Sequence, residues 1–317
     1  MPPLVKREKI RLAMLGMVEG NGHPYSWSAM FNGYNSEAMA SCPYPVIPVY
    51  LDKQPRQTLR IPNANVTHIW TDDPADARHV AECALIPNIV ERPEEVIGKV
   101  DAVIVATDKG HEHVERCRPF VEAGLPVFVD KPMVDNSADL RTFTRWVESG
   151  KAIMSSSCMR YGKEYLPYRL STHELGELRY VNITTAKTWE RYGIHALESI
   201  YPILGPGFLS ARNTGTVNRN VVHLKHQRGV DAVVIANMDM GGGSGVLTLC
   251  GTADWVTVKS RDSFFAFKSQ LEAFVQYLRT GERPFPFEET RELMAIVIAG
   301  IRSREEDGRE VLLNEIL

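Results

Sequence analysis

The pattern of apolar positions in the middle of the chain predicts a strand, a helix and a second strand in succession. Residues 100–106 form an almost unbroken apolar run, which is typical of a parallel strand buried on both faces. Residues 113–123 carry a helical pattern and precede Gly124, where a helix end favours a left-handed residue. Residues 126–129 form a second short strand, and Lys131 follows it closely. Because open α/β folds bind ligands at the carboxyl edge of the sheet, Lys131 is a candidate functional residue.

The segments before this region continue the same alternation of strands and helices. Strands are expected at residues 9–17, 66–70 and 88–90, and helices at residues 74–85 and 92–97. This order predicts an α/β domain with a doubly wound parallel sheet.

Residues 33–65 depart from that alternation, because the second strand comes late in the chain. Five prolines occur in this stretch, so we expect an ordered insertion without a long helix. The insertion either decorates the domain or covers the active site or an interface.

The second half of the chain has the pattern of a mainly antiparallel sheet. Strands are expected at residues 179–185, 216–226, 230–237, 245–250 and 255–258. The glycine-rich residues 241–245 lie between two of these strands rather than before a helix. We therefore interpret them as a wide hairpin and not as a phosphate-binding loop.

Composition limits the classes of protein that the chain can represent. Its 317 residues suffice for two domains, and its 44% hydrophobic and 24% charged residues are ordinary for a globular protein. The net charge of −3 favours neither nucleic acid nor an anionic membrane as a partner. Apolar runs are too short to span a membrane, and no signal peptide is expected. The five scattered cysteines form no metal-binding cluster, so we expect reduced thiols, no metal and a cytoplasmic location.

A glycine-rich connection follows the first predicted strand. It contains Gly16, Gly20, Asn21 and Gly22, but not the GxGxxG spacing of the usual dinucleotide fingerprint. Pro24 can begin the next helix, and free N–H groups at a helix N-terminus suit a phosphate. The alternative is a connection that binds no ligand.

Two aspartates follow the second predicted strand. An acidic residue at this place, here Asp72, can bind the adenosine ribose and repel a 2′-phosphate, which favours NAD over NADP without excluding NADP. Either Asp72 or Asp73 can instead cap the helix that begins at Pro74. Each aspartate can take one of these two roles.

The motifs of the middle segment resemble the glucose–fructose oxidoreductase, inositol dehydrogenase and rhizopine catabolism family, called Gfo/Idh/MocA. The resemblance rests on Ala106-Thr107, on His113, on Glu122-Ala123-Gly124 and on Asp130-Lys131-Pro132. Two departures are aspartate where the family usually has glutamate at position 130, and one additional residue after Thr107.

Later motifs extend the resemblance over nearly the whole chain. They include residues 176–181, residues 192–198 with His195, residues 271–284 and residues 308–311. The resemblance implies a dinucleotide-binding domain at residues 1–133 and a substrate-binding domain at residues 134–317, whose C-terminal segment packs back on the first. It also implies a homodimer or homotetramer formed through the large sheet of the second domain.

The resemblance further implies hydride transfer between NAD and a hydroxyl-bearing carbon of a sugar, cyclitol or sugar acid. Lys131 is then the catalytic cation, which can also relay a proton if burial lowers its pKa, and His195 is the base. The substrate-binding residues are expected to be Arg160, Tyr161, Arg191 and Tyr192. The cofactor-binding residues are expected to be Gly16, Gly20, Asn21, Gly22, Asp72, Thr107, His113, Asp130 and Lys131. For His195 the alternative is a structural histidine in a polar network. Trp189, Tyr161 and Tyr192 can stack on a sugar ring or simply pack in the core.

One departure concerns the catalytic pair itself. The family usually has an aspartate four residues before the histidine, whereas this chain has Arg191. An arginine suits an anionic substrate, and Glu190 or Glu198 could replace the missing carboxylate. The alternative function is a family member without net redox turnover, namely a sugar-binding regulatory or partner protein, or a lyase or hydrolase that uses bound NAD.

Overall fold

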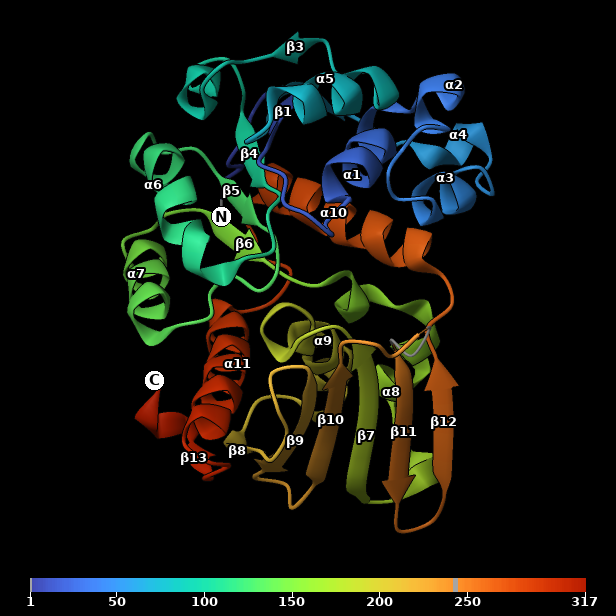
Figure 1. The fold of residues 1–317 in the computed structure, drawn as a ribbon, viewed down its shortest axis with the longest axis vertical. Coiled ribbons are helices and arrows are strands. Elements are labelled where there is room, and N and C mark those ends of the chain that lie inside the picture. The colour runs from blue at the N-terminus through green and yellow to red at the C-terminus, as the bar shows by residue number, and fades with distance from the viewer. Residues whose placement is uncertain (1, 242–244) are drawn as a thin grey trace.

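The computed structural model describes residues 2–241 and 245–317, which form two domains (Figure 1). The first domain has a six-stranded sheet and the second a seven-stranded sheet. The predicted fold class, a doubly wound parallel sheet joined to an α+β domain, is confirmed.

The six strands of the first sheet are all parallel and follow the order β3-β2-β1-β4-β5-β6. Their bounds are β1 Ile10–Leu15, β2 Ala64–Trp70, β3 Asn88–Ile89, β4 Ala102–Val105, β5 Val127–Val129 and β6 Ile153–Ser155. The boundary expected at residues 133 and 134 stays a prediction, but β6 follows it in the chain and still belongs to the first sheet.

The helices of this domain alternate with its strands. They are α1 His23–Asn32, α5 Pro74–Cys83, η1 Pro93–Val96, η2 Gly110–Glu112, α6 His113–Glu122 and α7 Ser137–Glu148. Asp73 caps α5, because its carboxylate accepts a hydrogen bond from the Ala75 N–H at 2.8 Å. The role of helix cap expected for one of the two aspartates is thus confirmed for Asp73.

The central strands β1, β4 and β5 of the first sheet are buried on both faces, as their apolar runs predicted. Leu12 and Met14 of β1 pack in one hydrophobic cluster, and Ala13 and Leu15 pack in another. Successive side chains of a strand point to opposite faces, so a strand covered on both sides needs apolar residues at every position.

Residues 33–65 contain only short helices, as expected. These are α2 Ser36–Met39, α3 Val46–Leu51 and α4 Arg56–Leu59. Side chains of the insertion reach the glycine-rich connection, since a Cβ on Gly22 would lie 2.6 Å from Ile47 and 2.7 Å from Tyr44. The insertion therefore helps to shape the start of α1.

The second sheet has the order β12-β11-β7-β10-β9-β8-β13. Its strands are β7 Leu178–Ala186, β8 Phe208–Asn213, β9 Arg219–His226, β10 Asp231–Asn237, β11 Val246–Gly251, β12 Trp255–Lys259 and β13 Val311–Leu312. Only β7 and β10 pair in parallel, and the other neighbours pair antiparallel. The sequence pattern did not reveal β8 or β13.

The hairpin expected between β10 and β11 is wrong. These two strands are not neighbours, because β7 lies between them and pairs with both. Of the glycine-rich residues 241–245, residues 242–244 lie outside the described part of the chain. A glycine-rich link between strands cannot by itself show which strands pair.

The second domain also contains most of the remaining helices. They are η3 Cys158–Tyr161, η4 Lys163–Tyr165, α8 Leu166–Leu170, η5 His173–Leu175, η6 Trp189–Gly193, α9 Ile194–Leu204, α10 Ser263–Thr280, α11 Phe287–Glu305 and η7 Leu313–Glu315. Helix α10 lies against the first domain (Figure 1), where Phe274 and Leu278 join the cluster that contains Leu12. Helix α10 thus packs on the first domain. Across residues 2–241 and 245–317, no helix has the length and apolar content that crossing a membrane requires.

Candidate active site

Lys131 lies at the carboxyl edge of the first sheet, between two acidic residues. It follows β5 and is only 2% exposed. Its Nζ is 3.6 Å from the Oδ2 atom of Asp108, which follows β4. Burial disfavours the charged amine, but the nearby Asp130 and Asp108 carboxylates outweigh burial and raise the Lys131 pKa. The expectation that burial lowers this pKa is therefore wrong, and Lys131 acts as a permanent cation.

Asp130 is fully buried and bound on several sides. Its carboxylate contacts His23 Nδ1 at 2.6 Å, accepts from Asn21 Nδ2 at 2.9 Å, and accepts from the Lys131 N–H at 2.7 Å. Burial opposes the charged carboxylate, yet His23, Lys131 and Asn21 together lower the Asp130 pKa. Asp130 and Asn21 thus hold the strand end that carries Lys131, and neither is exposed to contact a cofactor directly.

His195 comes from the second domain, in the first turn of α9. Its Nδ1 lies 2.6 Å from the Oγ atom of Ser157, a residue that is 0% exposed. Burial, with the positive charges of Lys131 and Lys187, lowers the His195 pKa well below its usual range. His195 is therefore neutral at pH 7, as a general base requires.

Tyr192 lies between these two residues. Lys131 Nζ is 5.2 Å from the centre of the Tyr192 ring, and the rings of Tyr192 and His195 are 4.8 Å apart. The Tyr192 hydroxyl accepts a hydrogen bond from Lys187 Nζ at 2.8 Å. The structure thus brings Lys131, Tyr192 and His195 together from the two domains.

Arg191 faces the first domain. Its Nη2 donates to Asp108 Oδ1 at 2.6 Å and to the Glu19 carbonyl at 3.0 Å. Asp108 is 1% exposed, and its Oδ2 atom has no hydrogen-bond partner among the described residues. Asp108 of the first domain thus contacts both Arg191 and Lys131.

Arg160 and Tyr161, both expected to bind substrate, belong to a buried network. Arg160 is 7% exposed, pairs with Glu198 and with Glu289, and stacks on Phe285 at 3.9 Å. Because its charge is met by two protein carboxylates, the structure argues against a substrate contact. Tyr161 adjoins this network, and its buried hydroxyl has no partner among the described residues.

The other carboxylate and aromatic candidates on this side also serve the fold. Glu198 accepts from the Ser157 N–H at 3.2 Å besides pairing with Arg160, and Glu190 pairs with Arg304. Both carboxylates are thus engaged by arginines. Trp189 is 0% exposed and donates to the Val297 carbonyl at 2.9 Å, so it packs in the core.

Thr107 and His113, expected to contact the cofactor, fix each other. Both are 0% exposed. His113 Nε2 lies 2.9 Å from the Thr107 carbonyl, and its Nδ1 lies 2.9 Å from the Met133 carbonyl. These contacts join the ends of β4 and β5 and so position Asp108 and Lys131.

The glycine-rich connection fits closely against this edge. Gly16 has φ +83°, and a Cβ there would lie 2.7 Å from Thr107 Cγ2, so only glycine allows this approach. Gly20 has φ +80°, and a Cβ there would lie 3.7 Å from both Lys187 Nζ and Arg191 Nη2. A ligand group above Gly20 would therefore meet two cations of the second domain.

An apolar pocket adjoins Asp72 at the same sheet edge. Its lining includes Leu15, Trp70, Val105, Arg116 and Phe120. Asp72 Oδ1 accepts from Arg116 Nη2 at 2.8 Å. An apolar slot beside a carboxylate and behind a glycine turn suits an adenosine group, so the residues present fit a dinucleotide.

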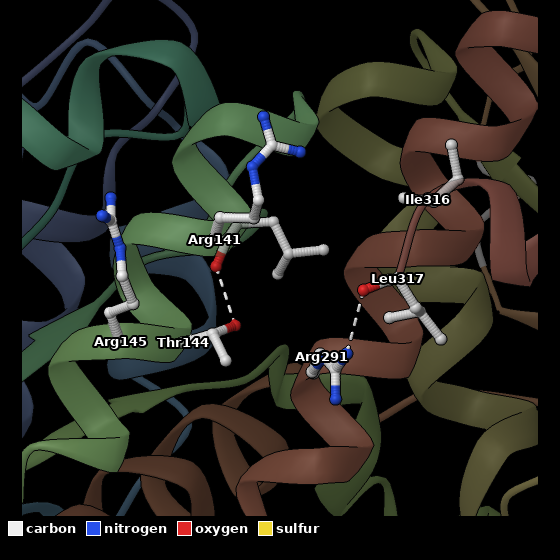
Figure 2. Close-up of a pocket in the computed structure, with 7 residues that line it drawn as sticks. Arg141, Thr144, Arg145, Arg291, Ile316 and Leu317 are labelled. Atoms are coloured by element: carbon white, nitrogen blue, oxygen red, sulfur yellow. Dashed lines mark hydrogen bonds between the residues drawn. The ribbon is translucent and has the colours of Figure 1, made fainter.

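A metal cluster and a second pocket are the other features that could form a site. Within the described ranges, no group of three or more His, Cys, Asp or Glu side chains is arranged to hold a metal ion. Figure 2 shows another pocket, lined by Arg141 and Arg145 of α7 and by Arg291 of α11, where Arg291 donates to the Leu317 carbonyl at 3.1 Å. None of the predicted site residues lines it.

Four residues of this site were not among the predicted ones. They are His23, Asp108, Ser157 and Lys187. Asp108 had a signal in the sequence, because it follows directly after a predicted strand at the carboxyl edge of the sheet. The contacts of the other three, His23 with Asp130, Ser157 with His195 and Lys187 with Gly20, join residues far apart in the sequence, which no local pattern shows.

A protein-family model matches part of the first domain. Residues 44–157 match the Gfo/Idh/MocA sequence model, which is described as an oxidoreductase family with an NAD-binding Rossmann fold. The predicted resemblance is thereby confirmed, and the description agrees with NAD as the cofactor. A curated protein of Amycolatopsis mediterranei, provisionally named as the oxidoreductase subunit of UDP-kanosamine synthase, is 28% identical over 109 residues. That match spans 34% of this chain and 30% of the relative.

Solved structures share the fold over nearly the whole chain. Myo-inositol 2-dehydrogenase from Lactobacillus plantarum has a TM-score of 0.74 at 16% identity and covers 96% of this chain and 99% of its own. An oxidoreductase from Agrobacterium radiobacter, solved with NAD+, L-tartaric acid and magnesium, has a TM-score of 0.74 at 15% identity. That match covers 98% of this chain and 100% of the other. At these identities the likeness establishes the fold.

Proposed function

We propose that this protein, whose first domain matches the Gfo/Idh/MocA family, is an NAD-dependent oxidoreductase acting on a sugar, cyclitol or sugar acid. The observation that carries the proposal is the meeting of a cationic Lys131 and a neutral His195 on either side of Tyr192. When bound, the nicotinamide ring accepts the hydride from the substrate carbon.

The two groups have complementary roles in removing the hydroxyl proton. His195 Nδ1 is engaged with Ser157 Oγ, so its Nε2 is the nitrogen that takes the proton. Lys131 keeps its proton and stabilises the negative charge that develops on the substrate oxygen. This division follows from environments that shift the two pKa values in opposite directions.

The substrate class is supported by the comparisons and by the charges around the site. Inositol dehydrogenases and a complex with L-tartaric acid are among the structures that share the fold. Lys131 is the cation beside Tyr192 and His195, which favours a substrate with hydroxyl or carboxylate groups. The alternative without redox turnover gains no support from these findings.

A binding and turnover experiment tests the proposal. NAD and NADP are titrated by calorimetry, and a panel of cyclitols, sugars and sugar acids is then screened for reduction of the bound nucleotide. We expect NAD to bind and at least one polyol to reduce it, with loss of reduction but not of folding in His195→Gln. Absence of NAD binding at millimolar concentration would overturn the proposal.

We also propose that the chain forms a homodimer or homotetramer through the open face of the second sheet, and that it acts in the cytoplasm. The support is the outer face of that sheet, where Tyr180, Val221 and Trp255 are 39%, 41% and 65% exposed. Covering these side chains would bury apolar area.

A further inference from the structure

The first turn of α1 has little capacity to bind a phosphate with its own N–H groups. The His23 N–H donates to Asn21 Oδ1 at 3.0 Å, and the Tyr25 N–H donates to the Gly22 carbonyl at 3.1 Å. Pro24, between them, has no N–H group. Ile47 and Tyr44 of the insertion also lie over Gly22. The donors that a Rossmann helix usually offers to a diphosphate are thus occupied or missing.

Two cations of the second domain lie at the same connection. Lys187 Nζ donates to the Gly20 carbonyl at 3.1 Å, and Arg191 Nη2 donates to the Glu19 carbonyl at 3.0 Å. Lys187 has φ +61°, a left-handed conformation that is uncommon for a residue with a side chain. This turn directs its ammonium group across the domain boundary to the loop.

These cations retain charge that the described residues do not fully neutralise. Lys187 forms no salt bridge within the described part of the chain, and its other partner is the Tyr192 hydroxyl at 2.8 Å. Arg191 shares its charge with Asp108, but its buried Nε has no partner among the described residues. Lysine and arginine side chains donate stronger hydrogen bonds to the charged oxygens of a diphosphate than to neutral carbonyl oxygens.

We propose that Lys187 and Arg191 bind the diphosphate of the dinucleotide, so that the second domain supplies the donors that α1 does not. This inference rests on the proposed function, because it takes the dinucleotide as the ligand. It adds that cofactor binding depends on residues from both domains. In the absence of the nucleotide, the carbonyl oxygens of Glu19 and Gly20 accept the hydrogen bonds that phosphate oxygens would accept when it binds.

Binding of ADP-ribose to the full-length protein tests this inference, because ADP-ribose has the diphosphate but no nicotinamide. We expect Lys187→Met to weaken binding of ADP-ribose and of NAD about tenfold or more, the usual loss for a charged hydrogen bond. Binding of adenosine should not change. The affinity of Lys187→Met for ADP-ribose should also fall less steeply with salt.

Two further variants separate charge from folding. Arg191→Lys keeps a positive charge beside Asp108 and should weaken ADP-ribose binding less than Arg191→Met does. Arg179→Met removes an exposed arginine that pairs with Glu177 elsewhere on the second domain, and should bind like the wild type. Thermal unfolding shows whether each variant is folded.

Three results would overturn the inference. Equal ADP-ribose affinity in Lys187→Met and wild type would exclude a diphosphate contact. A raised KM for an anionic substrate with unchanged ADP-ribose affinity would assign the cations to the substrate instead. If wild-type protein binds neither ADP-ribose nor NAD, the proposed function fails together with this inference.

Discussion

Lys131 and His195 lie close together but respond to their surroundings in opposite ways. Two carboxylates, Asp130 and Asp108, raise the lysine pKa, whereas burial and the lysine charge itself lower the histidine pKa. Near neutral pH one residue is therefore a fixed cation and the other a free base. Position 191 itself carries an arginine, which pairs with Asp108 of the first domain.

Removing the lysine charge should abolish most of the activity. We expect Lys131→Met to lower kcat by about 100-fold or more, the scale of losing one preorganised group that stabilises charge in the transition state. Lys6→Met, which removes an exposed lysine near the N-terminus, should leave kcat unchanged. Steady-state kinetics with the best polyol measures both. Wild-type kcat in Lys131→Met would contradict the assigned role.

The lowered His195 pKa predicts the acid side of the pH profile. The base is active when neutral, so kcat/KM should fall only below the usual histidine range, at pH values under about 6.5. The same shift affects stability, since the unfolded state binds a proton below about pH 6.5 that the folded state resists. The unfolding free energy should therefore fall as pH drops below this value, and less so in His195→Gln. If kcat/KM instead fell with a pKa above 7 as the pH is lowered, His195 would not be buried as described.

Asp72 and Arg116 predict how the nucleotide is selected. In Asp72→Ser, the Arg116 guanidinium loses one of its two carboxylate partners, retains Glu112, and can bind a 2′-phosphate. We expect NADP affinity to rise about tenfold while NAD affinity falls. Asp73→Ala is the control at the neighbouring position, because it removes the α5 cap and should cost about 1 kcal/mol of stability without changing nucleotide preference. Calorimetric titration of NAD and NADP measures both variants. An unchanged ratio of NAD to NADP affinity in Asp72→Ser would contradict this role of Asp72.

Among the elements, those of the first sheet could be predicted and those at the domain boundary could not. Strands β1, β4 and β5 are buried on both faces and therefore appear in the sequence as continuous apolar runs. The pairing of β7 with both β10 and β11 leaves no comparable signal, because glycine-rich links are compatible with many topologies. Lys131 could be predicted from its place after a strand. Lys187 and Ser157 could not, because their partners come from distant parts of the chain.

The insertion at residues 33–65 is predicted to fix the shape of the glycine-rich connection. In Gly22→Ala, the new methyl group would lie 2.6 Å from Ile47 and 2.7 Å from Tyr44, so the insertion must shift. We expect a loss of about 1–3 kcal/mol in unfolding free energy, as for other overpacked sites, together with weaker NAD binding. Gly241→Ala, where no described residue lies within 4 Å, should be nearly neutral in denaturant unfolding. Equal unfolding free energies of Gly22→Ala and Gly241→Ala would mean that the insertion does not pack tightly against the glycine-rich connection.

For the whole molecule, the open face of the second sheet is the expected place of self-association. Val221→Lys puts a charge on this face, where it would be desolvated in an assembly, and should shift the protein toward monomers by at least about tenfold in dissociation constant. Ile97→Lys, on a 39% exposed residue of the first domain, should not. Sedimentation velocity over a range of concentrations measures both. A wild-type protein that is monomeric at all concentrations would contradict this assembly.

Transfer of an isotopic label tests the central claim most directly. The protein is incubated with NAD and with a polyol that carries deuterium on the reacting carbon, and the reduced nucleotide is then examined by mass spectrometry. The account predicts deuterium in the nicotinamide ring with wild-type protein and a signal at least about 100-fold smaller with Lys131→Met. Bound NAD that stays unreduced and unlabelled with every cyclitol, sugar and sugar acid tested would contradict it.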